Sequence, residues 1–121
     1  MIKALIIDQA TRFSDSLESF IKAKGHEACS AKSVIEAIFI LEKEEPHLVF
    51  LDLLFLGTPS GLMLIERMKK SNKKRKIYLT CGPDAMGEEL AKRIGVDGAI
   101  FKPLQLAEIN RLIDRTCEEL G

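Results

Sequence analysis

Five short apolar runs alternate along this chain with five segments of helical periodicity, and this alternation restricts the possible folds. The runs lie at residues 3–7, 26–31, 48–52, 77–80 and 99–101. The third, Leu-Val-Phe-Leu-Asp, is apolar up to its terminal carboxylate, Asp52, which is typical of a strand buried on both faces of a parallel sheet. Strands that alternate with helices favour an α/β fold in which helices cover both faces of such a sheet.

The order of the strands follows from few rules. Right-handed crossovers leave a handful of topologies. Of these, the flavodoxin-like order 2-1-3-4-5 places the second strand at an edge, and the run 26–31 has the mixed polarity expected there. We therefore predict a doubly wound, five-stranded parallel sheet of (βα)5 type, with residues 1–121 forming a single domain.

The helical segments carry start signals and apolar stripes. We expect helices to begin at a Thr11 cap, at a Ser33 cap that Glu36 completes as a capping box, at Gly61, at Pro83 and near residue 105. The side chains expected to face the core are Phe13, Leu17, Phe20, Ile21, Val34, Ala37, Ile38, Leu41, Leu62, Ile65, Met68, Met86, Leu90, Ala91, Ile94, Leu106, Ile109, Leu112, Ile113 and Leu120. Ser14 falls on the opposite, polar face of the first helix.

The second helix is apolar over an arc wider than one core-facing stripe. Ile35, Phe39 and Ile40 lie outside that stripe. Deeper burial of the helix is the simpler interpretation, and a patch that binds a partner is the alternative.

Composition excludes several classes of function. Lys+Arg and Asp+Glu number 18 each, so net charge gives no case for binding nucleic acid or an anionic membrane. The basic run 69–76 has no aromatic residues and is interpreted as a solvated connection. No apolar run approaches the roughly 20 residues of a membrane helix, and the N-terminus lacks the layout of a signal peptide. Three widely spaced cysteines form no disulfide framework, which favours a cytoplasmic protein with reduced thiols.

Polar side chains follow four of the five predicted strands. Asp8 and Gln9 follow the first, Asp52 ends the third, Thr80 ends the fourth and Lys102 follows the fifth. Carboxyl ends of parallel strands share one edge, where open α/β sheets bind ligands. Two carboxylates and an amide oxygen suit Mg²⁺, and a hydroxyl with an ammonium suits phosphate oxygens. This set is what phosphoryl transfer to a carboxylate requires.

The chain resembles the receiver domains of two-component response regulators over essentially its whole length. The resemblance rests on five pieces of sequence: Leu5-Ile6-Ile7-Asp8, the run from Pro46 to Asp52, Thr80, Gly95-Val96-Asp97-Gly98, and Phe101-Lys102-Pro103. It implies that Asp52 is the phosphoacceptor, that Thr80 and Lys102 bind the phosphoryl group, and that Asp8 and Asp52 hold Mg²⁺ with Gln9 and the Leu54 backbone carbonyl. The Lys102–Pro103 bond is a candidate for the cis form, which is open mainly to X–Pro bonds.

Three departures from the family pattern affect these expectations. Gln9 stands where the family has a second metal-binding acid, so Mg²⁺ should bind more weakly. The loop after Asp52 is longer by one residue and more apolar, which brings Leu54 and Phe55 near the site. Ala99 stands where the family has an aromatic switch residue, and we group it with Ile35, Phe39 and Ile40 as a possible partner surface.

Two functions remain open on the sequence. The first is a phosphoacceptor, not a turnover enzyme, that takes a phosphoryl group from a histidine kinase or phosphotransfer protein and signals to a downstream protein or fused effector domain. The second is a degenerate pseudo-receiver that binds proteins without phosphorylation. A nucleotide- or flavin-binding enzyme is disfavoured because the chain has neither GxGxxG nor GxxxxGK[ST].

Overall fold

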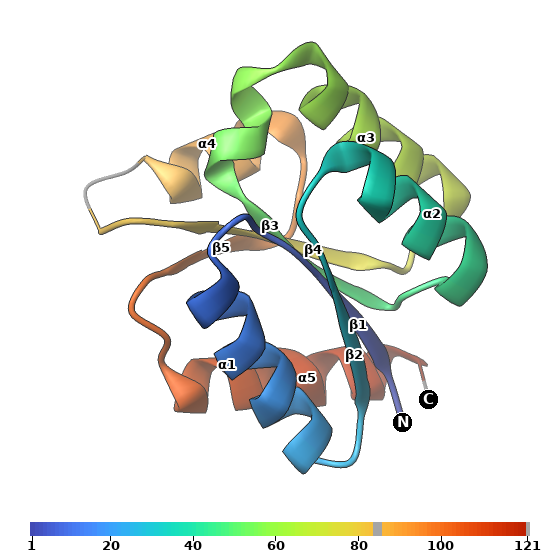
Figure 1. Ribbon diagram of the computed structural model, residues 1–121, viewed down its shortest axis with the longest axis vertical. Helices are drawn as coiled ribbons and strands as arrows, with labels where there is room; N and C mark the ends of the chain where they lie inside the picture. The colour runs from blue at the N-terminus through green and yellow to red at the C-terminus, as the bar shows by residue number, and fades with distance from the viewer. Residues whose placement is uncertain (84–85, 121) are drawn as a thin grey trace.

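In the computed structural model, a five-stranded parallel sheet lies between two layers of helices (Figure 1). The structure describes residues 1–83 and 86–120. The strands are β1 (Lys3–Ile7), β2 (Glu27–Ala31), β3 (Leu48–Asp52), β4 (Lys76–Cys81) and β5 (Gly98–Phe101). The helices are α1 (Thr11–Ala23), α2 (Val34–Glu44), the 3₁₀ helix η1 (Leu53–Gly57), α3 (Pro59–Ser71), α4 (Gly87–Ile94) and α5 (Leu106–Leu120). The sheet order β2-β1-β3-β4-β5 confirms the predicted topology.

The register of the strands brings their carboxyl ends to one edge. Ile7 pairs with Leu51, Asp52 with Thr80, and Cys81 with Phe101. The residues that follow β1 and β5 therefore reach the same edge as the last residues of β3 and β4.

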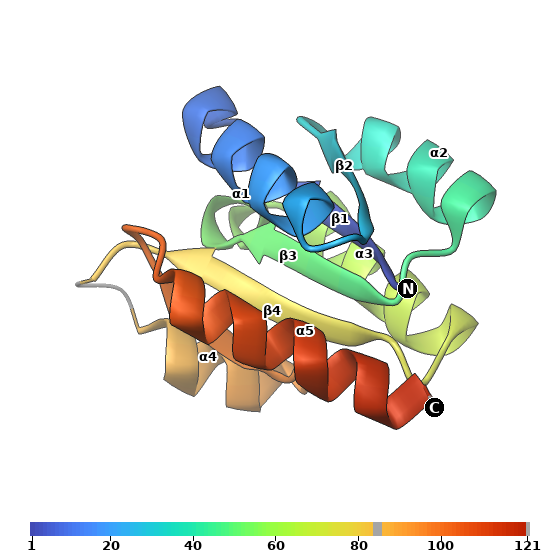
Figure 2. The same cartoon turned by 90° about the horizontal axis from the view of Figure 1, so that it is seen from below.

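Each face of the sheet has its own apolar core. Helices α1 and α5 cover one face, and α2, α3 and α4 cover the other (Figure 1). Figure 2 views the molecule from the α1 and α5 side and shows these two helices in front of the sheet. Central strand β3 is buried along its whole length, as its apolar sequence predicts. Among the described residues, no helix is both long and apolar enough to cross a membrane.

The starts of α1 and α3 differ from the predictions in their capping residues. Thr11 is the first residue of α1 and makes no cap; its Oγ1 lies 2.7 Å from Lys32 Nζ. Helix α3 begins at Pro59, before Gly61, because Thr58 Oγ1 accepts the Gly61 N–H at 3.2 Å. The Ser33 cap is confirmed, since its Oγ accepts the Glu36 N–H at 3.1 Å.

Helix α4 begins at Gly87, four residues after the predicted start at Pro83. Residues 84 and 85 of that predicted helix lie outside the described residues. Met86 precedes the helix and is largely exposed, so its placement in the core was wrong. Leu62, Leu106 and Leu120 are also exposed, because each lies at the margin of its helix's apolar stripe.

Two polar side chains are buried against expectation. Ser14 is buried because its hydroxyl donates to the carbonyls of Ala10 and Thr11 within its own helix. Arg75 lies in the basic run that we interpreted as solvated, yet its guanidinium is buried. It donates to the carbonyls of Pro46 and Met68, at 2.7 and 2.9 Å, and so ties the end of α3 to the loop before β3.

Candidate functional site at the carboxyl edge

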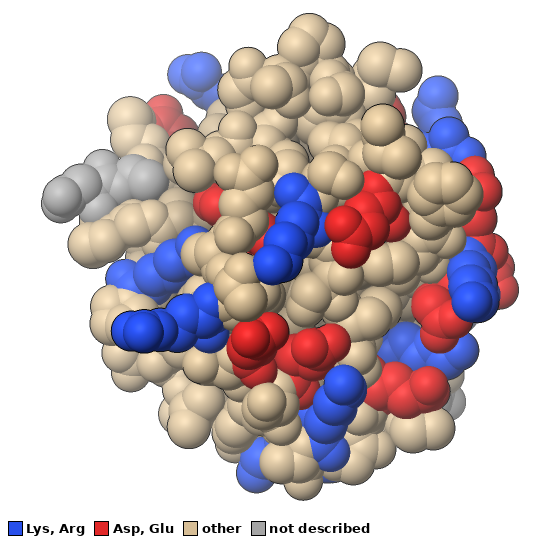
Figure 3. Space-filling view, in the orientation of Figure 1, with Lys and Arg blue, Asp and Glu red and all other residues tan. Residues whose placement is uncertain are grey.

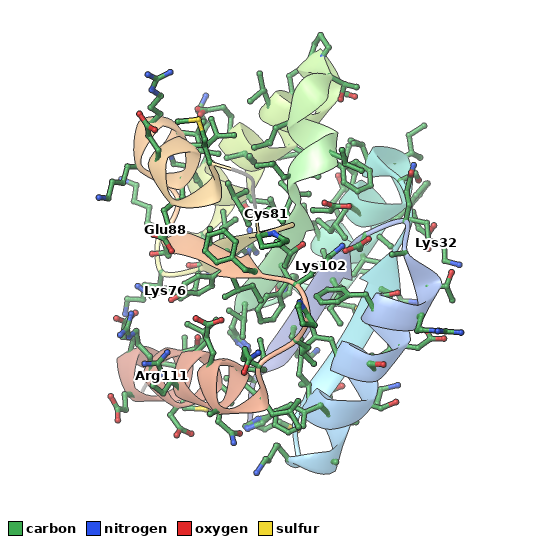
Figure 4. The ribbon with its side chains drawn as sticks, turned by 90° about the vertical axis from the view of Figure 1, so that its left-hand side faces the viewer. Lys32, Lys76, Cys81, Glu88, Lys102 and Arg111 are labelled. Atoms are coloured by element: carbon green, nitrogen blue, oxygen red, sulfur yellow. The ribbon has the colours of Figure 1, made fainter. Side chains whose placement is uncertain are left out.

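The sheet brings four of the predicted site residues together. Asp8, Asp52 and Thr80 are each at least nine-tenths buried at the carboxyl edge. Lys102 follows β5, and its ammonium lies near both carboxylates. Figure 4 faces this edge of the sheet and labels Lys102. The predicted convergence is therefore present.

The ammonium of Lys102 is shared unequally between the two carboxylates. Its Nζ lies 2.9 Å from Asp8 Oδ2 and 4.0 Å from Asp52 Oδ2. The Phe13 ring lies under the same ammonium, 4.6 Å from Nζ to the ring centroid, an attractive cation–π contact. The Lys102–Pro103 bond that follows is cis. Lys102 is thus held by Asp8 and Phe13 more closely than by Asp52.

The backbone orients the carboxylates. The Ala10 N–H donates to Asp8 Oδ1 at 2.8 Å, and the Leu54 N–H donates to Asp52 Oδ1 at 3.4 Å. Burial raises the pKa of Asp52, and the neighbouring charge of Asp8 raises it further, while Lys102 acts in the opposite direction. Asp52 is therefore a poorly solvated carboxylate, and a raised pKa of this kind is common at functional sites.

Thr80 supplies a hydroxyl whose bonding is incomplete. Its Oγ1 is buried and has no hydrogen-bond partner among the described residues. Thr80 is paired with Asp52 in the register of β3 and β4. A buried hydroxyl without a partner is costly, so a ligand bound at Asp52 that reached this atom would satisfy it.

A cavity of about 460 Å³ opens beside Asp52. Its lining is mixed, with Gln9, Lys32, Ser33, Val34, Ile35, Asp52, Leu54, Phe55, Thr58 and Ser60. Leu54 and Phe55 are near the site, as the lengthened loop predicted. Gln9 also reaches the cavity, although its side chain is exposed.

The oxygens at this edge of the sheet fit a weakly bound Mg²⁺. No cluster of three or more His, Cys, Asp or Glu side chains that could hold a metal occurs among the described residues. Two carboxylates, one amide oxygen and water nevertheless match the preference of Mg²⁺ for few protein ligands. Asp8, Asp52 and Lys102 carry a net charge of −1 where a third acid in place of Gln9 would make it −2. The ligand atoms are therefore of the type that Mg²⁺ prefers, but their total negative charge is low.

Two residues at the site were missed by sequence reasoning. Phe13 was assigned only to the core stripe of α1, and nothing in the sequence links it to Lys102. Lys32 was not singled out, yet it follows β2 at the same edge and borders the cavity; Figure 4 labels it with Lys102. Its position directly after a predicted strand was the one sequence feature that could have placed Lys32 at this edge.

The assignment of Ala99 to a partner surface was wrong, and Ile40 is partly buried. Ala99 is buried beneath α4, where a Cβ placed on Gly87 would lie 3.2 Å from the Ala99 Cβ. The two small residues let α4 approach β5 closely and leave no space for an aromatic ring. Ile40 packs against the core, whereas Ile35 and Phe39 are exposed, so deeper burial of α2 does not explain them.

Solved structures of similar fold include receiver domains. The receiver domain of NtrX from Brucella abortus is 25% identical, with a TM-score of 0.82, and the match covers 95% of this chain and 98% of that one. A two-component response regulator from Clostridium difficile is 21% identical, with a TM-score of 0.84 and coverage of 100% and 99%. A CheY-like receiver domain protein from Methanospirillum hungatei JF-1 is 22% identical, with a TM-score of 0.80 and coverage of 98% and 96%.

The chain spans about a quarter of the longer NtrX chains that it matches, 26% in the complex with ADP at 24% identity and a TM-score of 0.83. The family model of the response regulator receiver domain matches residues 4–114. That match runs from β1 into α5 and includes Asp8, Asp52, Thr80 and Lys102. The chain therefore belongs to the response regulator receiver domain family.

Proposed function

We propose that this domain accepts a phosphoryl group on Asp52 and uses it to switch a protein contact. The domain acts in the cytoplasm. Its donor is a histidine kinase or phosphotransfer protein, and the contact is with a downstream protein or a fused effector domain. One observation supports this proposal: Asp52, which borders an open cavity, pairs in the strand register with Thr80, whose hydroxyl has no hydrogen-bond partner in the described part of the chain.

The residues at the edge have distinct tasks in the transfer. An Asp52 carboxylate oxygen attacks phosphorus, the P–O bond forms, and the P–N bond of the donor phosphohistidine breaks with its electron pair leaving on the imidazole. The Thr80 hydroxyl donates to a phosphoryl oxygen, and the Lys102 ammonium pairs with another. Bound Mg²⁺, held by Asp8, Asp52, Gln9 and the Leu54 carbonyl, would neutralise charge on the phosphoryl oxygens. The phosphorylated domain is the signal, so the domain assists the transfer without being a turnover enzyme.

Mass spectrometry tests the proposal directly. The protein is incubated with acetyl phosphate and Mg²⁺, and we expect the mass of one phosphoryl group to be added to wild type and not to Asp52→Asn. Thr80→Ala and Lys102→Ala should slow the gain without moving its site. Absence of any gain in wild type across a wide range of Mg²⁺ concentration would refute phosphoacceptor function.

A phosphorylation-independent binding module is the second candidate. The observation that favours it is the strong pairing of Lys102 with Asp8 beside a neutral Gln9, which weakens the site for metal. A partner that binds wild type and Asp52→Ala with equal affinity, in the presence of acetyl phosphate and Mg²⁺, would support this candidate over the first.

A further inference from the structure

Five large apolar side chains are exposed together on one side of the molecule. They are Ile35 and Phe39 on α2, Leu54 on η1, and Leu62 and Met63 on α3, with exposed fractions of 71%, 70%, 77%, 45% and 70%. We call this surface the α2–α3 face. Residues 53–65 contain no charged side chain, and the surface over η1 and the start of α3, at the top of Figure 3, is uncharged in that view.

The α2–α3 face combines a ridge with a groove. Ile35 and Phe39 are one helical turn apart and form an outward ridge on α2. Next to this ridge lies a groove of about 710 Å³, walled by Val34 and Ile38 of α2 and by Leu62 and Met63 of α3. Cavities of about 300–1,000 Å³ can hold a drug-sized molecule, so this groove has room for two apolar side chains.

The groove connects the site to the rest of the face. Val34 and Ser60 line both the groove and the cavity beside Asp52. Further along, an ion pair between Glu42 and Arg67 bridges α2 and α3. The rim on α3 carries both signs of charge, from Glu66, Arg67 and Lys70.

We propose that a second copy of this chain binds the α2–α3 face in a twofold-symmetric pair. A ridge and a groove lie side by side on one face, so one twofold rotation places the ridge of each copy in the groove of the other; this is the self-complementarity that an isologous interface requires. A net charge of zero adds no overall repulsion between copies. The rim charges of both signs can pair across the twofold axis.

The size of the face predicts a weak, reversible pair. Each exposed apolar side chain presents on the order of 100 Å², so the five present about 500 Å² per copy and about 1,000 Å² in the pair. The area of about 500 Å² per copy is near the upper limit of the largest apolar patch on a typical monomer. The area of about 1,000 Å² in the pair is near the lower limit of specific interfaces. We therefore expect a weak, transient pair, which is to be sought over about 10 μM to 1 mM protein.

Sedimentation velocity on the full chain, over that concentration range and without a phosphoryl donor, tests the pair. We expect the weight-average sedimentation coefficient of wild type to rise towards a dimer. Phe39→Glu on the ridge and Met63→Glu in the groove should each weaken the pair by about tenfold or more. Met86→Glu, at an equally exposed methionine outside this face, is the matched control and should behave as wild type. Circular dichroism checks that each variant is folded.

Three outcomes would overturn the proposal. The first is a wild type that stays monomeric at 1 mM, in which case the face binds a different partner or none. The second is a dimer that both Phe39→Glu and Met63→Glu leave intact. The third is a dimer that is sensitive to the ridge variant alone, because the groove would then be unoccupied. Since no phosphoryl donor is present, these results do not depend on phosphorylation of Asp52.

Discussion

Replacing Gly61 by alanine tests how tightly η1 is packed between the site and α3. A Cβ at residue 61 would lie 1.7 Å from the Phe55 carbonyl oxygen and 2.6 Å from its carbon. Real Cβ atoms essentially never approach a heavy atom within 3.0 Å, so the carbonyl must move by at least the difference, 3.0 − 1.7 = 1.3 Å. The obstacle is backbone, which cannot rotate aside as a side chain can.

The cost of this clash is opposed by a gain in helix propensity. Forced displacement in a packed region costs about 1–3 kcal/mol. The moved carbonyl accepts the Thr58 hydroxyl at 3.1 Å, and the same hydroxyl caps the Gly61 N–H, so losing this cap adds about 1 kcal/mol. Alanine in a helix returns at most about 1 kcal/mol relative to glycine. The net loss in free energy of unfolding is therefore about 1–3 kcal/mol.

Urea denaturation followed by far-ultraviolet circular dichroism measures this loss. Gly57→Ala is the matched control, because a Cβ at residue 57 meets nothing within 4 Å and the residue has no positive φ. We expect the control to be neutral or more stable by up to about 1 kcal/mol. If Gly61→Ala lost no more stability than Gly57→Ala, the inferred close packing of α3 on η1 would be incorrect. Leu54 and the Asp52 carboxylate adjoin the displaced segment, so phosphorylation of Gly61→Ala should also be slower.

Four further substitutions give separate expectations. Asp52→Asn should raise the Tm at pH 7, because burial raises the pKa of Asp52 and the folded protein therefore disfavours the charged carboxylate. This gain in Tm should disappear as the pH is lowered towards 3.8, the pKa of Asp52 in the unfolded chain, because the wild-type carboxylate is then protonated in the folded protein. His47 Nδ1 accepts the Lys3 N–H at 2.9 Å, and burial lowers the pKa of His47. Neutral His47 therefore contributes its full stabilisation above pH 6.5, and this stabilisation is lost as the pH falls below 6.5. In urea titrations below pH 6.5, the free energy of unfolding of wild type should decrease relative to that of His47→Gln. Arg75→Met should cost about 2–4 kcal/mol in the same assay because it leaves buried carbonyls without donors, while Lys74→Met, at an exposed neighbour, should change it by less than about 0.5 kcal/mol. Gln9→Asp should increase Mg²⁺ affinity by about tenfold or more in an NMR titration, because it adds a negative charge at the site.

The strands, their order and the site at their carboxyl edge could be predicted because each depends on a local pattern. The run ending in Asp52 is apolar at every position, and a parallel sheet then fixes which residues share an edge. The predicted meeting of Asp8, Asp52, Thr80 and Lys102 needed no knowledge of side-chain contacts.

What the sequence left undetermined depends on contacts between distant elements. Arg75 looks like one member of a solvated basic run, and only the approach of the loop at Pro46 gives its guanidinium a buried acceptor. Ala99 was grouped with a partner surface because of the family position that it occupies, whereas its burial depends on the close approach of Gly87 from the distant helix α4. Ile35 and Phe39 fit a buried arc equally well on periodicity, but α2 buries the side defined by Ala37 and Leu41 and leaves these two residues exposed.

The charges at the carboxyl edge couple Lys102 to metal binding. With Gln9 neutral, Lys102 supplies the nearest opposite charge to Asp8, at 2.9 Å, and leaves Asp52 less compensated at 4.0 Å. A cation that binds Asp8 must compete with this ammonium, which lowers metal affinity beyond the effect of the missing acid. If a cation bound Asp8 and Asp52 were phosphorylated as proposed, the same competition would release Lys102 from Asp8 and leave its ammonium free to pair with the phosphoryl group. We therefore expect the charge pattern that weakens the resting metal site to favour the phosphorylated state once metal and phosphoryl group are bound together.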